Sequence, residues 1–169
     1  MLTTGSPTII GPTDGDSVTL QTIGVRFMIP AADTDSRLSL VEHPIPPGAL
    51  AAPLHRHNRE DEYSYVLEGR MGALLGDDVV EAGPGDLVYK PRGQWHTFWN
   101  AGDEPARILE IISPAGFERF FAELGPVAAG GAPDPEAMGE LCARYALDMD
   151  PGSPPDLCAR FGLWFPGAQ

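Results

Sequence analysis

Hydrophobic and polar residues alternate along most of the chain in short runs, a pattern typical of β-strands that are buried on one face. The runs recur at intervals of about 8–12 residues, which favours a β-sandwich or barrel over alternating strands and helices. The predicted strands are Val18–Ile23, Val25–Ile29, Leu38–Glu42, Leu54–His57, Glu62–Leu67, Met71–Leu75, Asp78–Glu81, Asp86–Tyr89, Trp95–Trp99 and Arg107–Ile112. The sequence therefore predicts an all-β domain.

Glycine and proline mark the breaks between these runs. The chain holds 20 Gly and 18 Pro, and many of them fall in turn signals such as Pro46-Pro47-Gly48 and Gly83-Pro84-Gly85. Because 43% of the residues are hydrophobic, we interpret this content as the tight turns of one packed domain rather than as disorder. Residues 1–16 are predicted to form a loose arm with one edge strand at Thr8–Ile10.

The periodicity changes from that of a strand to that of a helix after Pro114. The residues on one helical face are Phe117, Phe120, Phe121 and Leu124. Gly125-Pro126 is expected to end this helix, residues 126–133 to form a connector, and Asp134 to cap a second helix that begins at Pro135. An apolar tail follows at Leu157–Phe165.

We therefore expect three parts. These are the arm at 1–16, a β-barrel at 17–113, and a helical extension at 114–169 that packs on the barrel.

The acidic charge narrows the possible partners. The formal net charge is −13, so the chain lacks the excess of basic residues that drives binding to nucleic acid or to an anionic membrane. No apolar stretch approaches the roughly 20 residues of a membrane span, and the first 30 residues do not resemble a secretory signal. We expect a cytoplasmic protein whose two cysteines, Cys142 and Cys158, are reduced packing residues.

Three of the four histidines lie in two segments with a pattern that suits metal binding. His55 and His57 are two residues apart and project from the same face of a strand, and His96 lies on a later strand. Glu62 opens an apolar run, where a carboxylate that enters the interior needs a charged partner. Glu60 and Asp61 compete with Glu62 for this role, because a shift of one residue reverses the face.

These two segments resemble the paired motifs of the cupin superfamily. The second motif, G-x5-P-x-G-x2-H-x3-N, matches at every position from Gly85 to Asn100. The first, G-x5-H-x-H-x3-4-E-x6-G, matches from His55 to Gly69 but has six residues instead of five between Gly48 and His55. The resemblance implies a double-stranded β-helix, or jelly-roll barrel, with C-terminal helices added to it here.

The resemblance also implies one divalent transition metal held by His55, His57, Glu62 and His96. Three imidazoles and one carboxylate suit Fe, Mn, Ni, Co, Cu or Zn, and the absence of thiol ligands argues against a structural zinc site. Four ligands on an ion that prefers six leave two positions for water, dioxygen or a chelating substrate, as in a catalytic site.

Candidate substrate residues are Phe98, Ser64 and Arg26. Phe98 shares a face with His96, and Ser64 shares a face with Glu62, whereas Arg26 is a further residue that could line a substrate cavity. His43 is expected to play no part in the site. The apolar helix face at Phe117–Leu124 is expected to be core, with a lid over the barrel mouth as the alternative.

The segment Ser113–Gly125 (SPAGFERFFAELG) resembles bacterial single-domain cupins related to quercetin dioxygenases. The resemblance implies dioxygen-dependent cleavage of an enolic or hydroxylated aromatic small molecule, with Glu62 as both metal ligand and proton acceptor. The alternatives are a redox-neutral metal cupin, such as an isomerase, lyase or cyclase of a biosynthetic pathway, and a non-catalytic module that binds a small molecule. The family resemblance also implies a homodimer.

Overall fold

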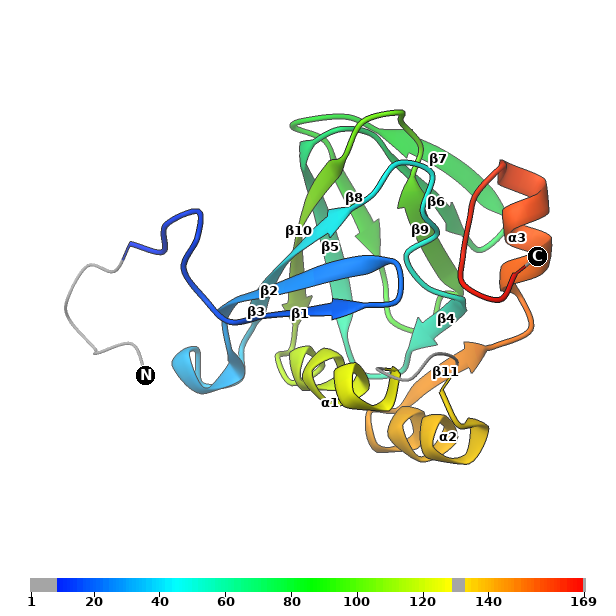
Figure 1. Cartoon of the computed structure of the whole chain (residues 1–169). Coiled ribbons are helices and arrows are strands. Elements are labelled where there is room, and N and C mark those ends of the chain that lie inside the picture. Colours follow the sequence, from blue (N-terminus) through cyan, green and yellow to red (C-terminus); the bar gives the residue numbers. More distant parts are fainter. Residues whose placement is uncertain (1–8, 129–132, 169) are drawn as a thin grey trace.

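The computed structural model describes residues 9–128 and 133–168, which form two antiparallel β-sheets and three α-helices (Figure 1). The six-stranded sheet has the order β1-β2-β3-β10-β5-β8, and the five-stranded sheet has the order β11-β4-β9-β6-β7. The strands are β1 Ser17–Leu20, β2 Ile23–Ile29, β3 Ser39–Ile45, β4 Leu54–His57, β5 Asp61–Glu68, β6 Met71–Leu75, β7 Asp78–Ala82, β8 Leu87–Lys90, β9 His96–Asn100, β10 Ala106–Ser113 and β11 Leu147–Asp150. The predicted all-β class with C-terminal helices is confirmed.

Each of the ten strands predicted between Val18 and Ile112 overlaps a strand of the structure, because the alternation and the turn residues agree along this part of the chain. The exception in detail is Val18–Ile23, which the hairpin turn at Gln21 and Thr22 divides between β1 and β2. Thr22 is buried, and its hydroxyl donates a hydrogen bond to the carbonyl oxygen of Leu50 at 2.7 Å. Because Thr22 continues the spacing of two residues set by Val18 and Leu20, the sequence pattern shows no break at this turn.

The main core fills the space between the two sheets. It is formed by the inward residues of the alternating strands together with side chains from the helices; fully buried examples are Val41, Val66, Met71, Ile108 and Leu141. On β10, buried and partly exposed residues alternate without interruption from Ala106 to Ser113. The strand therefore presents one face to the interior and one to the outside.

The first helix, α1 Glu118–Ala128, is longer than predicted. The helix continues through Gly125 and Pro126, where the sequence indicated an end. Pro126 lies in the last turn, so the proline ring removes one intrahelical hydrogen bond near the terminus instead of breaking the middle of the helix. The helix packs against β1, with Val18 next to Gly125.

The second helix, α2 Pro135–Arg144, begins as predicted. The Asp134 carboxylate accepts hydrogen bonds from the backbone N–H groups of Glu136 and Ala137. Residues 129–132 of the expected connector and Thr8 of the expected edge strand lie outside the described residues, and Ile9 and Ile10 are not in a strand.

Two C-terminal elements were not predicted. Strand β11 pairs with β4, so that Met149 lies opposite His55, and it extends the five-stranded sheet. Helix α3, Pro154–Phe161, lies beside β6 and β9, while α1 and α2 lie together at one end of the sheets (Figure 1). The Phe161 ring stacks on Trp99 with 4.4 Å between ring centroids. The apolar tail thus covers the outer face of the five-stranded sheet.

Within residues 9–128 and 133–168, no helix is long and apolar enough to cross a membrane.

Candidate metal centre

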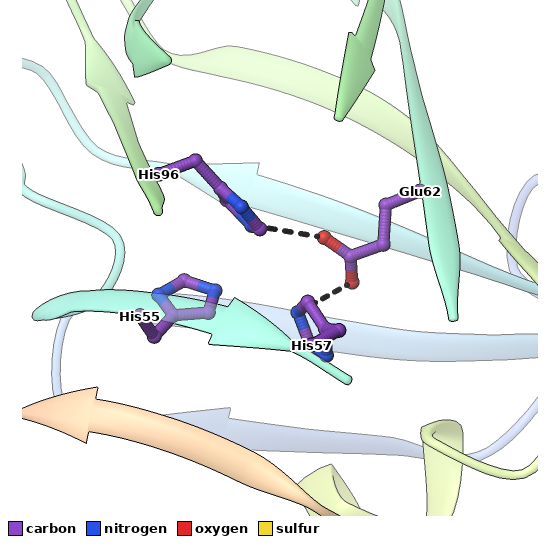
Figure 2. A group of neighbouring side chains, drawn as sticks. All are labelled: His55, His57, Glu62 and His96. Carbon is purple, nitrogen blue, oxygen red and sulfur yellow. Dashed lines mark ion pairs between the residues drawn. The ribbon is translucent and has the colours of Figure 1, made fainter. Parts of the chain in front are cut away.

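Three strands of the two sheets bring four candidate ligands together. His55 and His57 come from β4, His96 from β9 and Glu62 from β5 (Figure 2). His55 and His96 are direct partners in the antiparallel pairing of β4 with β9, and the period of two places His57 on the same face as His55. One possible ligand atom from each residue lies within 4.8 Å of the others. All four side chains are buried.

Backbone hydrogen bonds orient two of the imidazoles. The Nδ1 atom of His55 lies 2.7 Å from the carbonyl oxygen of Pro53, and Nδ1 of His96 lies 3.0 Å from that of Gln94. A carbonyl only accepts, so each Nδ1 carries the proton and each Nε2 presents a lone pair to the cluster. Burial lowers the pKa of both His55 and His96, which keeps these rings neutral, as metal ligands must be.

The polar atoms at the centre fit a bound cation. Within the described part of the chain, His57 Nε2 and His96 Nε2 are buried without a hydrogen-bond partner. They lie 3.4 Å from Glu62 Oε1 and Oε2, respectively (Figure 2). Buried polar atoms without partners are costly, and a divalent metal would satisfy these lone pairs and the carboxylate together. The donor set of three nitrogens and one oxygen suits the metals expected from the sequence.

The structure separates Glu62 from its two acidic neighbours. Asp61 faces outward, where both of its carboxylate oxygens accept hydrogen bonds from Arg92. The nearest carboxylate oxygen of Glu60 lies 3.9 Å from His57 Nδ1, on the side of the ring away from the cluster centre. Glu62 is therefore the carboxylate that joins the three histidines.

A buried lysine and a second glutamate adjoin the cluster. Lys90 Nζ lies 2.9 Å from Oε2 of Glu62 and 2.9 Å from Oε2 of Glu110. Burial alone would lower the pKa of Lys90, but Glu110 and Glu62 raise it above its ordinary value, so the lysine is charged. Burial would raise the pKa of Glu62, but His57 and Lys90 hold it well below its usual range. Burial raises the pKa of Glu110 to about 7, against the opposing effect of Lys90.

Sequence reasoning missed Lys90 and Glu110, although two signals pointed to them. Lys90 is the only lysine of the chain, and it follows Val88 by two residues on a strand, which places both on one face. Glu110 stands between Ile108 and Ile112 with the same period. Charged residues at the inward positions of apolar strands indicate a buried ion pair.

The cluster opens into a cavity of about 750 Å³. His55, His57 and Glu62 line it together with Glu110, and the rest of the wall is mainly apolar. Contributing apolar side chains include Leu20, Phe98, Phe117, Phe121, Met138, Cys142 and Met149. The Phe117 ring meets His57 edge-on with 4.2 Å between centroids. The helix face predicted as core therefore also closes one side of this cavity.

The candidate substrate residues lie in three different places. Phe98 lines the cavity, where its role stays a prediction. Ser64 is fully buried, and its hydroxyl donates a 2.7 Å hydrogen bond to Glu110 Oε2, so it supports a cavity residue.

Arg26 corrects our expectation, because it does not line the cavity. Its guanidinium donates a 2.8 Å hydrogen bond to Glu42 and further bonds to the backbone carbonyl groups of Gly11 and Asp14. On β2 the inward positions belong to Ile23 and Val25, so alternation turns Arg26 away from the interior.

His43 also lies differently from its expected place outside the site. It is buried and lines the cavity, its ring meets Phe121 edge-on, and its Nδ1 lies 3.1 Å from the carbonyl oxygen of Gly24. Burial lowers the pKa of His43 to about 4. The ring is therefore a neutral part of the cavity wall.

Comparison with known proteins places this geometry in a family. The family model described as "Cupin domain" matches residues 41–112, which include all four cluster residues. The polyketide cyclase RemF from Streptomyces resistomycificus is 30% identical, with 64% of this chain and 80% of that chain covered and a TM-score of 0.54. KdgF from Halomonas sp. is 18% identical with a TM-score of 0.59 over 68% of this chain and 99% of that chain, which shows a common fold only.

A second relative, like RemF, has a name that refers to polyketides. The tetracenomycin polyketide synthase protein TcmJ from Streptomyces glaucescens is 32% identical over 83 residues, which make up 49% of this chain and 54% of that protein. The chain spans about half the length of the curated relatives it matches. Neither TcmJ nor RemF is named as a dioxygenase, so the quercetinase-like assignment gains no support from them.

The strand arrangement, the two motifs and the buried cluster agree with these comparisons. The chain belongs to the cupin superfamily.

Proposed function

We propose that this protein is a metal-dependent, redox-neutral cyclase that closes a ring in a polyketide-type substrate. The observation that carries the proposal is the cluster of three histidines and one glutamate at the wall of a mainly apolar cavity. The similarity to the polyketide cyclase RemF and to TcmJ supports the choice of reaction. It favours the redox-neutral alternative of the sequence analysis over the dioxygenase.

The size and lining of the cavity suit such a substrate. Its volume of about 750 Å³ lies within the roughly 300–1,000 Å³ typical of small-molecule sites. Aromatic rings such as Phe98 and Phe117 offer flat apolar contacts to a folding carbon chain. An apolar wall also excludes water, which strengthens the electrostatic interactions of the few polar groups inside.

His55, His57, Glu62 and His96 would hold the metal. When bound, a divalent ion of the expected kind supplies Lewis acidity toward a carbonyl oxygen of the substrate. The same four ligands accept several metals, so the proposal leaves its identity among Fe, Mn, Ni, Co, Cu and Zn.

The chain supplies the group that accepts a proton. In an aldol-type closure, a CH₂ group between two carbonyls loses a proton and attacks a third carbonyl carbon, and the new alkoxide takes up that proton to become a hydroxyl. The same carbon then loses its second proton, a C=C bond forms, and the hydroxyl takes up this proton and leaves as water. No electron acceptor is needed. Glu62 is ionised and lines the cavity, and Lys90 fixes its Oε2 atom at 2.9 Å. We assign to Glu62 the acceptance of the two carbon-bound protons in turn and the return of each to the oxygen that leaves.

The test is a comparison of turnover with and without dioxygen. Purified protein loaded with each candidate metal is incubated with a polyketide synthase that releases an uncyclised poly-β-ketone chain, and the products are separated and weighed by mass spectrometry. We expect a cyclised product that is lighter by one water, formed equally fast under nitrogen and in air. The His96→Ala variant, which loses a ligand, serves as the inactive control.

Two outcomes would overturn the proposal. Uptake of dioxygen coupled to product formation would return the assignment to a dioxygenase. Metal-loaded protein that binds the chain but leaves its rate of cyclisation unchanged would indicate a module that binds without catalysis.

A further inference from the structure

Glu110 has one carboxylate oxygen that is fixed and one that is free. Oε2 accepts hydrogen bonds from the Ser64 hydroxyl at 2.7 Å and from Lys90 Nζ at 2.9 Å. Oε1 is buried and has no hydrogen-bond partner among the residues that the structure describes. The side chain as a whole is only 1% exposed. A buried acceptor of this kind is costly unless a partner from outside the chain completes it.

The position of Glu110 indicates where that partner lies. Glu110 lines the same cavity as His55, His57 and Glu62, although β10 is not a strand that carries a metal ligand. Ser64 and Lys90, which bind its other oxygen, do not line the cavity. The two donors therefore bind the carboxylate from outside the cavity lining, and Oε1 is the oxygen left for a partner in the cavity.

The rest of the wall makes this oxygen selective. Its surroundings in the cavity are mainly apolar, and Phe98, Phe121 and the neutral ring of His43 line the same cavity. Inside an apolar wall, a fixed acceptor discriminates strongly, since a ligand that cannot donate a hydrogen bond leaves the acceptor unsatisfied.

We propose that Glu110 Oε1 accepts a hydrogen bond from a phenolic or enolic hydroxyl of the substrate, and that Glu110 is thereby a residue that determines specificity. The inference rests on the proposed cyclase and deepens it, because it restricts the substrate to polyketide-type molecules that carry a hydroxyl donor. Ser64 and Lys90 act as positioning residues for this contact.

The exchange of Glu110 for glutamine makes a sharp prediction. Ser64 and Lys90 both donate, so a glutamine would turn its carbonyl oxygen toward them and its NH₂ group toward the cavity. The cavity would then offer a donor where it now offers an acceptor. A hydroxyl on the ligand should no longer be preferred over an ether oxygen.

The experiment measures binding of naphthoresorcinol and of its dimethyl ether to the metal-loaded protein by isothermal titration calorimetry. In the wild type we expect at least about tenfold tighter binding of the dihydroxy compound, equivalent to about 1.4 kcal/mol. In Glu110→Gln this preference should fall to less than about twofold, with the metal content unchanged. The same difference between the wild type and Glu110→Gln should appear when both proteins are treated with a chelator, because the ligand hydroxyl then has no metal to bind.

The matched control is Glu42→Gln. Glu42 is also a buried glutamate of the six-stranded sheet, but it pairs with Arg26 and does not line the cavity, so the preference should stay at the wild-type value. If Glu110→Gln does not fold, Glu110→Asp carries the test. It keeps the charge beside Lys90 but withdraws the carboxylate by one methylene, and it should reduce the preference at least about threefold.

A wild type without the tenfold preference, including one that binds neither compound, overturns the inference. So does a preference that survives in Glu110→Gln, or in Glu110→Asp where that variant carries the test. Turnover without the preference removes the role of Glu110 and leaves the proposed cyclase standing. The preference without turnover keeps the role of Glu110 as a binding residue and removes the cyclase.

Discussion

Replacement of Lys90 by methionine is expected to destabilise the protein by the cost of two unpaired buried carboxylates. Lys90 is 1% exposed, and its ammonium lies 2.9 Å from both Glu62 and Glu110. Methionine keeps the unbranched stem that fills the space next to Phe98 but removes the charge. Removal of one partner from a buried ion pair costs about 3–5 kcal/mol, because the remaining charge stays desolvated.

This loss is large but measurable. The whole domain is expected to be stable by about 5–15 kcal/mol, so the Lys90→Met variant should still fold. We would measure the free energy of unfolding of metal-free protein at neutral pH by urea denaturation followed by circular dichroism. Because a divalent metal would neutralise Glu62, its addition should recover part of the loss.

A double-mutant cycle separates the electrostatic cause from a packing defect. With Glu110→Gln already present, Lys90→Met should cost less by about 1–3 kcal/mol, since one of the stranded carboxylates is gone. The control is Arg70→Met, which breaks an exposed ion pair with Glu81 and should cost less than about 1 kcal/mol. A Lys90→Met loss below about 1 kcal/mol, or strict additivity with Glu110→Gln, would refute the reasoning.

Three further predictions concern the rest of the fold. His43 has a pKa of about 4 in the folded protein against 6.5 as its ordinary value, so the unfolded chain binds more protons below pH 6.5. The free energy of unfolding should therefore fall by about 3 kcal/mol as the pH falls toward 4. His43→Phe should remove this part of the acid sensitivity of the metal-free protein in urea titrations from pH 7 to 4, and an unchanged pH slope would contradict it. Gly72→Ala would place a Cβ 2.2 Å from Trp99 Nε1, and we expect overpacking to lower the free energy of unfolding in urea by about 1–3 kcal/mol. An unchanged free energy of unfolding would contradict this and mean that Trp99 and α3 shift at no cost. Asp134→Ala removes the acceptor of two backbone hydrogen bonds at the start of α2 and should cost about 1 kcal/mol by the same assay, whereas Asp134→Asn should cost little.

Local rules predicted most strands, whereas the resemblance to the paired cupin motifs implied the full set of four cluster residues. Alternation places His55 and His57 on one face, and the spacing to Glu62 sets the face of the carboxylate. The same rule shows that Arg26 follows the inward Val25 and so faces outward, an inference available from the sequence.

The remaining features depend on pairing between segments far apart in the chain. Strand β11 is only four residues long and alternates with aspartates, so it is defined by its pairing with β4 some 90 residues earlier rather than by its own pattern. The contact of Lys90 with Glu110 needs both β8 and β10 to pair with β5. A single sequence does not give that strand order, so the free oxygen of Glu110 emerged only from the fold.

The central claim, that His55, His57, Glu62 and His96 form one metal centre that faces the cavity, is tested most directly by cobalt(II) titration followed by visible absorption. We predict one equivalent of cobalt bound to metal-free protein, a spectrum without thiolate bands, and a change in the ligand-field bands when naphthoresorcinol is added. His96→Ala should lose this spectrum while it keeps the wild-type circular dichroism. A wild type that binds no cobalt, or a His96→Ala variant with an unchanged cobalt spectrum, would contradict the account.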